Sequence, residues 1–135
     1  MVRSFEAEVE RAFGFLVSEF GLSGPAEGAG DGPSRVRYSG ESLNYQIVFD
    51  PATRAVTTIV AKDIGAVRFT AELPALVLGA ALGTPANVRS DASTLSELRA
   101  TVLAQAGYVR RLQPYLTPLN VVPLMRAAHA TEDAS

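Results

Sequence analysis

The 135-residue chain contains neither cysteine nor tryptophan, and it has one histidine and one lysine. Without cysteine, disulfide bonds, thiolate metal ligands and cysteine nucleophiles are excluded, and nothing in the chain requires an oxidising compartment. Its basic residues are arginines apart from Lys62, and alanine and glycine are abundant, which is typical of a GC-rich bacterial genome. We therefore expect a cytoplasmic bacterial protein.

Long hydrophobic segments are also missing. The longest apolar run, residues 73–82, is interrupted by Pro74 and Gly79, and it is much shorter than the roughly 20 residues that a membrane helix needs. The first ten residues carry glutamates where a secretory signal has its apolar core. A formal net charge of -2 gives no general attraction to nucleic acid or anionic lipid. The sequence predicts neither a membrane nor a nucleic-acid partner.

Catalytic and metal-binding patterns are scarce. The single histidine, His129, lies near the C-terminus, where a rigid set of supporting groups is not expected. It would have to serve any serine triad or zinc site, and the chain has no Gly-x-Ser-x-Gly motif. Carboxylates occur at predicted turns and strand ends, with no spacing that fixes a catalytic pair: Glu41, Asp50, Asp63 and Glu72. We expect no cofactor and no enzymatic activity, and a carboxylate-dependent enzyme stays as an alternative.

A sheet is predicted in the centre of the chain. Apolar and polar residues alternate over residues 43–49, which is typical of a strand with one buried face. Asp50 and Pro51 favour a turn into a second strand over residues 55–61, on which either face is a plausible inner face. With flanking strands at residues 35–39 and 66–71, the pattern predicts a four-stranded antiparallel meander.

Helices are predicted on both sides of this meander. An apolar stripe with helical spacing runs through residues 5–20, with Ser4 as N-cap and Gly21 as a left-handed C-cap. Phe15 lies off this stripe, and we expect it to pack inside. Further helices are predicted over residues 73–82, from the Thr94–Glu97 capping box to Gln113, and over residues 119–128.

The predicted architecture is one α+β domain, residues 1–135, in which an N-terminal helix and the C-terminal helices pack on the sheet. Residues 23–34 are rich in glycine and proline and are expected to form a flexible loop. The polar residues 130–135 are expected to fray.

Charged residues form the candidate partner-binding sites. Acidic residues crowd the first helix, two arginines share one side of a strand, and two more end the long C-terminal helix; each set also has an ordinary structural explanation. The candidates are Glu6, Glu8, Glu10, Arg35, Arg37, Arg110 and Arg111.

The order of these segments resembles a known class of bacterial proteins. The segments are FGFLVSEFGL at residues 13–22, VRYSG at residues 36–40, the hairpin through Asp50, and a leucine-rich C-terminal helix. This pattern resembles small immunity-type proteins that accompany polymorphic secreted toxins. The resemblance implies a non-enzymatic module that binds and blocks a cognate toxin, with no catalytic residues.

Other functions remain open. Helix, meander and helix also resemble secretion-chaperone-like domains, which commonly dimerise and hold a segment of a partner. A homodimeric scaffold protein and a small-ligand-binding protein are further alternatives. A binding module predicts a surface patch of charged and aromatic groups, whereas an enzyme predicts a pocket with convergent carboxylates of perturbed pKa.

Overall fold

The computed structural model describes residues 2–28 and 33–134. The elements in chain order are α1 (Val2–Phe13), α2 (Phe15–Ser18), β1 (Ser23–Gly28), β2 (Ser34–Ser39), β3 (Leu43–Asp50), β4 (Ala55–Ile64), β5 (Val67–Glu72), α3 (Leu73–Gly79), a 3-10 turn (Pro85–Asn87), α4 (Leu95–Leu112), a second 3-10 turn (Gln113–Leu116), α5 (Val121–Ala127) and β6 (Thr131–Ala134).

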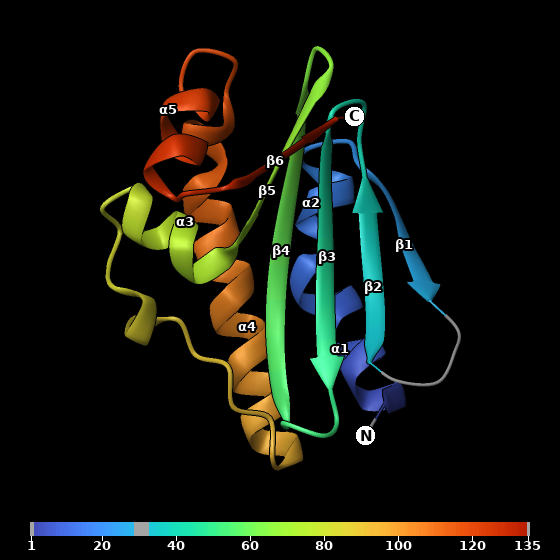
Figure 1. Ribbon diagram of the computed structural model, residues 1–135. Helices are drawn as coiled ribbons and strands as arrows, with labels where there is room; N and C mark the ends of the chain where they lie inside the picture. The colour runs from blue at the N-terminus through green and yellow to red at the C-terminus, as the bar shows by residue number, and fades with distance from the viewer. Residues whose placement is uncertain (1, 29–32, 135) are drawn as a thin grey trace.

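The strands form one antiparallel sheet in the order β1-β2-β3-β4-β5-β6. Helices α1 and α4 pack side by side against one face of this sheet, while α3 and α5 pack together beside β4 and β5 (Figure 1). The opposite face, turned toward the viewer in Figure 1, has no helix over β2, β3 and β4, and we call it the open face. The predicted α+β class and helix placement are confirmed, but the sheet has six strands, not four.

Strands β1 and β6 were not predicted. Residues 23–28, expected to belong to a flexible loop, pair with β2, so that Ala26 lies opposite Arg37 and Glu27 opposite Val36. Residues 29–32 of that predicted loop lie outside the described residues. At the other end, the tail expected to fray pairs with β5, with Thr131 opposite Thr70. The side chains of residues 23–27 and 131–134 are exposed, so apolar and polar residues do not alternate along these edge strands as they do along a half-buried strand.

The N-terminal helix is shorter than its apolar stripe predicted. It begins at Val2, ahead of the proposed Ser4 cap, and ends at Phe13, before the short helix α2 starts at Phe15. Gly21 has the predicted left-handed conformation, with a φ of 71°, and Leu22 N–H donates to the Leu16 carbonyl over 3.0 Å, but α2 already ends at Ser18. Phe15 is buried, as expected.

The strand pattern settles which faces are buried. Tyr45, Ile47 and Phe49 of β3 point into the core, as their alternation predicted. On β4, where both faces were plausible, Val56, Thr58 and Val60 are fully buried beneath the helices and the intervening residues face the open side. The predicted turn is confirmed as well, because Ala52 N–H donates to Asp50 Oδ1 over 2.9 Å.

The long helix α4 follows its predicted boundaries closely. Glu97 N–H donates to Thr94 Oγ1 over 3.1 Å and Thr94 N–H donates to Glu97 Oε1 over 3.2 Å, which forms the predicted capping box. The helix ends at Leu112, just before Pro114. Its first residue, Leu95, is exposed, and the buried residues of the helix begin at Leu98.

Candidate binding surface

The register of the strands places side chains of the open face in rows. Arg37, Gln46, Ile59 and Glu72 lie opposite one another across β2 to β5. The neighbouring row consists of Ser39, Asn44, Ala61 and Thr70. Because residues in such rows lie on the same side of the sheet, the two rows present one arginine, one carboxylate, two amides and two hydroxyls around the apolar Ile59 and Ala61.

A hollow of about 260 Å³ lies in the middle of the open face, and we call it the β2 hollow. Small residues such as Ala61 and Ser39 leave space between the longer side chains of the adjacent rows. Its lining residues are Arg37, Ser39, Asn44, Tyr45, Gln46, Ile59, Ala61, Arg68 and Thr70.

The arginines of the open face differ in how their charge is compensated. Arg68 forms two hydrogen bonds with the Asp63 carboxylate, of 2.7 and 3.0 Å, and this contact lowers the pKa of Asp63. Arg35 donates to the neutral Gln46 Oε1 over 3.0 Å. Arg37 is exposed and has no ion pair within residues 2–28 and 33–134. Uncompensated positive charge is therefore concentrated on β2, where Arg35 and Arg37 point to the same side as predicted.

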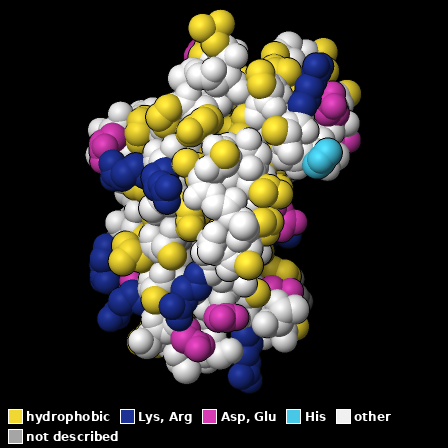
Figure 2. Space-filling view, turned by 90° about the vertical axis from the view of Figure 1, so that its left-hand side faces the viewer, with side chains coloured by type: hydrophobic (Ala, Val, Ile, Leu, Met, Phe, Trp, Pro, Cys, Tyr) yellow, Lys and Arg dark blue, Asp and Glu magenta, His cyan; other side chains and the backbone are white. Residues whose placement is uncertain are grey.

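A larger hollow of about 580 Å³ adjoins the first and shares Ile59 and Thr70 with it; we call it the α3 hollow. Pro74, Ala75 and Leu78 of α3 form its apolar wall, and Glu72 and His129 supply ionisable groups. Figure 2, which faces the α3 and α5 side, shows hydrophobic side chains interspersed with polar ones and the histidine at the surface. The two hollows are therefore neighbours, and both are lined by a mixture of apolar, polar and ionisable groups.

His129 lies in an ordered connection between α5 and β6, whereas the sequence predicted a terminus without rigid supporting groups. It follows α5 with a φ of 53°, its N–H donates to the Arg126 carbonyl over 3.0 Å, and β6 begins two residues later. Its exposed side chain lines the α3 hollow together with Glu72. Among the described residues, no group of three His, Asp or Glu side chains is arranged to hold a metal ion.

The three candidate glutamates of α1 have separate roles. Glu8 is 7% exposed and accepts from Arg99 Nε of α4 over 3.0 Å and from Arg11 over 3.3 Å. Its ion pair with Arg99 thus links α1 to α4. Glu10 instead lies beside Glu27 of β1, and the pKa of Glu10 is raised by hydrogen-bonding contact with that carboxyl, by partial desolvation and by the charges of Glu27 and Glu6.

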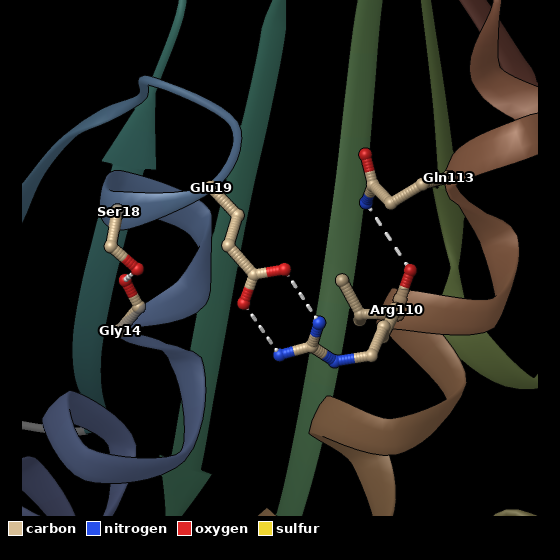
Figure 3. A network of polar contacts seen from close by, with 6 residues as sticks. Gly14, Ser18, Glu19, Arg110 and Gln113 are labelled. Carbon is tan, nitrogen blue, oxygen red and sulfur yellow. Dashed lines mark hydrogen bonds and ion pairs between the residues drawn. The ribbon is translucent and has the colours of Figure 1, made fainter.

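The two candidate arginines of α4 also differ. Arg110 makes hydrogen bonds of 2.8 and 3.0 Å to both carboxylate oxygens of Glu19 (Figure 3). Its guanidinium also lies 4.2 Å from the centre of the Phe15 ring. The ion pair lowers the pKa of Glu19 and links α4 to the segment after α2. Arg111 is exposed and lies over Tyr108 at 5.3 Å. Unlike Arg110, Arg111 has no ion pair within the part of the chain that the structure describes.

Comparison with known proteins adds no family. No family model, curated protein or solved structure matches this chain. Within the described residues, no helix has the length and apolar character needed to cross a membrane. The candidate surface must therefore be interpreted from its own geometry and charge.

Proposed function

We propose that the protein is a non-enzymatic binding module that captures a partner protein through the open face of its sheet. The observation that carries this proposal is the position of Arg37 in the lining of the β2 hollow, with Arg35 on the same side of β2 and Arg37 free of any ion pair in the described chain. Arginines beside a hollow, which a bound partner desolvates, are characteristic of the residues that dominate protein interfaces. In keeping with the immunity-type resemblance, the proposed partner is a cognate bacterial toxin with an acidic patch.

Other charged surfaces support this choice of face. Glu8 and Arg110 are already satisfied by partners within the chain, so a bound protein would have to break those contacts before using them. Arg37 of the open face has no such ion pair among the described residues and needs no such rearrangement. Its half-buried amides and hydroxyls, from Asn44, Gln46 and Thr70, surround the arginine with hydrogen-bonding groups.

Reversing the charge of Arg37 tests the proposal. Tagged wild-type protein and the Arg37→Glu variant are used to capture partners from the native lysate, followed by mass spectrometry and light scattering of the complex. We expect the partner's affinity to fall by about 30-fold or more, equivalent to about 2 kcal/mol, because an acidic group then faces another acidic group.

The matched control is Arg3→Glu on α1, an exposed arginine on the helix that covers the opposite face. This variant has the same change in net charge and should retain capture. A partner that is lost equally from both variants, or retained equally by both, would contradict binding at the open face. A clean homodimer without any partner would contradict the immunity-like function and favour a scaffold.

The α3 hollow supports a second candidate, a small-ligand-binding protein. Its volume of about 580 Å³ and its apolar wall with Glu72, His129 and Thr131 at the rim match the size and chemistry of ligand sites. If a ligand occupies it, native mass spectrometry of protein purified from its own host should show a bound small molecule that is lost when Ala75→Trp fills the hollow. An unliganded mass for the wild type would contradict this candidate.

A further inference from the structure

The β2 hollow is rich in hydrogen-bond donors. Its lining includes a guanidinium, two side-chain amides and two hydroxyls, from Arg37, Asn44, Gln46, Ser39 and Thr70. Four of these side chains make no hydrogen bond within residues 2–28 and 33–134: Arg37, Ser39, Asn44 and Thr70. No described carboxylate lines the hollow. A ligand that only accepts hydrogen bonds therefore finds donors here without competition from the protein's own acidic groups.

The orientation of Gln46 is fixed by a neighbouring arginine. Arg35 Nη1 donates to Gln46 Oε1 over 3.0 Å. Because a guanidinium has donors only, the oxygen of this amide must be the atom turned toward Arg35. The amide nitrogen of Gln46 makes no hydrogen bond in the described chain, so both of its N–H groups remain available to a ligand. Arg35 thus sets the donor character of Gln46 without lining the hollow itself.

The register of β2 and β3 groups these donors around one small space. Arg37 lies opposite Gln46, and Ser39 lies opposite Asn44. Neighbouring strands are about 4.8 Å apart, and residues two positions apart on a strand are separated by about 6.6 Å. The four side chains therefore start from the corners of a small rectangle on the open face. A compact group with two acceptor oxygens can meet donors from more than one corner.

The charges around the hollow fit a ligand with a single negative charge. Two arginines line it, but Arg68 is already compensated by Asp63, to which it donates over 2.7 and 3.0 Å. Arg37 has no ion pair among the described residues. One uncompensated charge matches a carboxylate better than a doubly charged phosphate group. Ile59 and Ala61 add apolar surface on β4, which suits the methylene groups of an acidic side chain.

We propose that the β2 hollow binds the carboxylate of an aspartate or glutamate side chain of the partner protein. Arg37 pairs with this carboxylate, and the amide N–H groups of Asn44 and Gln46 donate to its oxygens. With about 260 Å³, the hollow has room for one acidic side chain and for bridging water. A neutral amide in the same place offers one acceptor oxygen instead of two and no charge, so it binds more weakly. This inference rests on the proposed function, because it names the group through which the partner is recognised.

The test uses the purified full chain and two small ligands that differ in one functional group. One is glutamate blocked as its N-acetyl, N-methylamide derivative, and the other is glutamine blocked in the same way. Each is titrated at neutral pH and constant low ionic strength while ¹H–¹⁵N spectra record the side-chain signals of Arg37, Asn44 and Gln46. We expect blocked glutamate to shift these signals saturably, with a dissociation constant of about 1 to 10 mM. Blocked glutamine should bind about tenfold more weakly or worse.

Substitutions at Arg37 separate its charge from its geometry. Arg37→Gln should weaken the binding of blocked glutamate about tenfold or more, because the uncompensated charge of the hollow is removed. Arg37→Lys keeps the charge but loses the planar fork of donors, and should weaken binding about threefold or more. The matched control is Arg3→Gln, which removes the same charge from an exposed position on α1. It should bind blocked glutamate like the wild type.

The inference is overturned if no saturable shifts occur up to about 50 mM blocked glutamate, if both ligands bind equally, or if Arg37→Gln and Arg3→Gln have equal affinities. Tighter binding of blocked phosphoserine than of blocked glutamate would also overturn it, since a dianion would then be preferred. If blocked glutamate does not bind but Arg37→Glu loses the partner protein, the binding function holds and the carboxylate site fails. If blocked glutamate binds as expected and no partner is captured, the carboxylate site holds and the binding function fails.

Discussion

Replacing Gln105 with alanine is expected to lower the free energy of unfolding by about 3 kcal/mol. Gln105 is a buried residue of α4. Its Oε1 accepts from Thr58 Oγ1 over 2.8 Å, and its Nε2 donates to the carbonyls of Val56 and Arg89 over 2.8 and 2.7 Å. One amide thus joins the long helix, strand β4 and the segment that leads into α4.

The size of the effect follows from what alanine leaves behind. A buried hydroxyl and two carbonyls lose their partner, at about 1 kcal/mol each where water gains some access. Such access exists here, because a hollow of about 440 Å³ is lined by Gln105, Val56 and Ser90. A fully dry site would cost more. Urea unfolding followed by circular dichroism measures the change, with the slope against urea as a check on two-state behaviour.

Two adjacent threonines provide a matched control. Thr58→Val removes the hydroxyl that donates to Gln105 and should cost about 1 to 2 kcal/mol, because the amide oxygen is then buried without a partner. Thr57→Val makes the same chemical change on the open face, where the side chain is half-exposed, and should change stability by less than about 0.5 kcal/mol. Equal losses from both variants would show that the amide does not carry this energy.

The buried parts of the fold were predictable where local periodicity is strong. The alternation from Leu43 to Phe49 fixed a strand and its inner face, and the Thr94–Glu97 capping box fixed the start of α4. Strands β1 and β6 left no such trace. Their pairing is made by backbone groups, their side chains are almost all exposed, and glycine and proline in β1 pointed to a loop.

The candidate surface was predictable only in part. The spacing of Arg35 and Arg37 by two residues was enough to place both on one side of a strand. The hollow beside them depends on how β5, α3 and α5 are positioned, which involves residues distant in the sequence. Pairwise contacts such as that of Arg110 with Glu19 are likewise invisible to periodicity, since 91 positions separate the two residues.

Helical geometry alone separates the three glutamates of α1 into two groups. Residues four positions apart lie on nearly the same side of a helix, whereas residues two positions apart are separated by about 200°. Glu6 and Glu10 therefore share one side, and Glu8 lies on the other, where it meets Arg99 of α4. Reversing all three charges together would disrupt an internal ion pair, so Glu6 and Glu10 alone are the appropriate test of that surface.

Above about pH 10 the protein is expected to lose stability, because buried tyrosines resist ionisation. Burial raises the pKa of Tyr45 to about 12, against the opposing effect of the hydrogen bond from Gln113 Nε2. The pKa of Tyr38 is also raised to about 12, by burial and then by the charges of Glu10 and Glu27. Both pKa values lie above the value of about 10 in the unfolded chain.

The sign of the effect follows from this difference. Below pH 10 both tyrosines are protonated in either state, and their contribution to stability is fully present. As pH rises from 10 through 12, the unfolded chain releases its protons first, so unfolding becomes progressively more favourable. For Tyr45 a difference of about two pKa units corresponds to about 2.7 kcal/mol, and Tyr38 adds a loss in the same direction.

Urea midpoints measured from pH 8 to pH 12 test this expectation. The variant Tyr45→Phe should be less stable than the wild type at pH 8, because the bond from Gln113 is lost, yet its stability should fall less steeply above pH 10. If the urea midpoints of the two proteins fall equally steeply with pH above pH 10, the expectation for Tyr45 is contradicted.

Variants of Glu10 and Glu27 test independently what raises the pKa of Tyr38. In Glu10→Gln/Glu27→Gln, the charges that raise the pKa of Tyr38 are gone, so the alkaline loss of stability should be smaller than in the wild type. The control variant Glu41→Gln should lose stability at alkaline pH as steeply as the wild type does. If both variants behave alike, the two carboxylates do not raise the pKa of the Tyr38 hydroxyl, and this prediction is wrong.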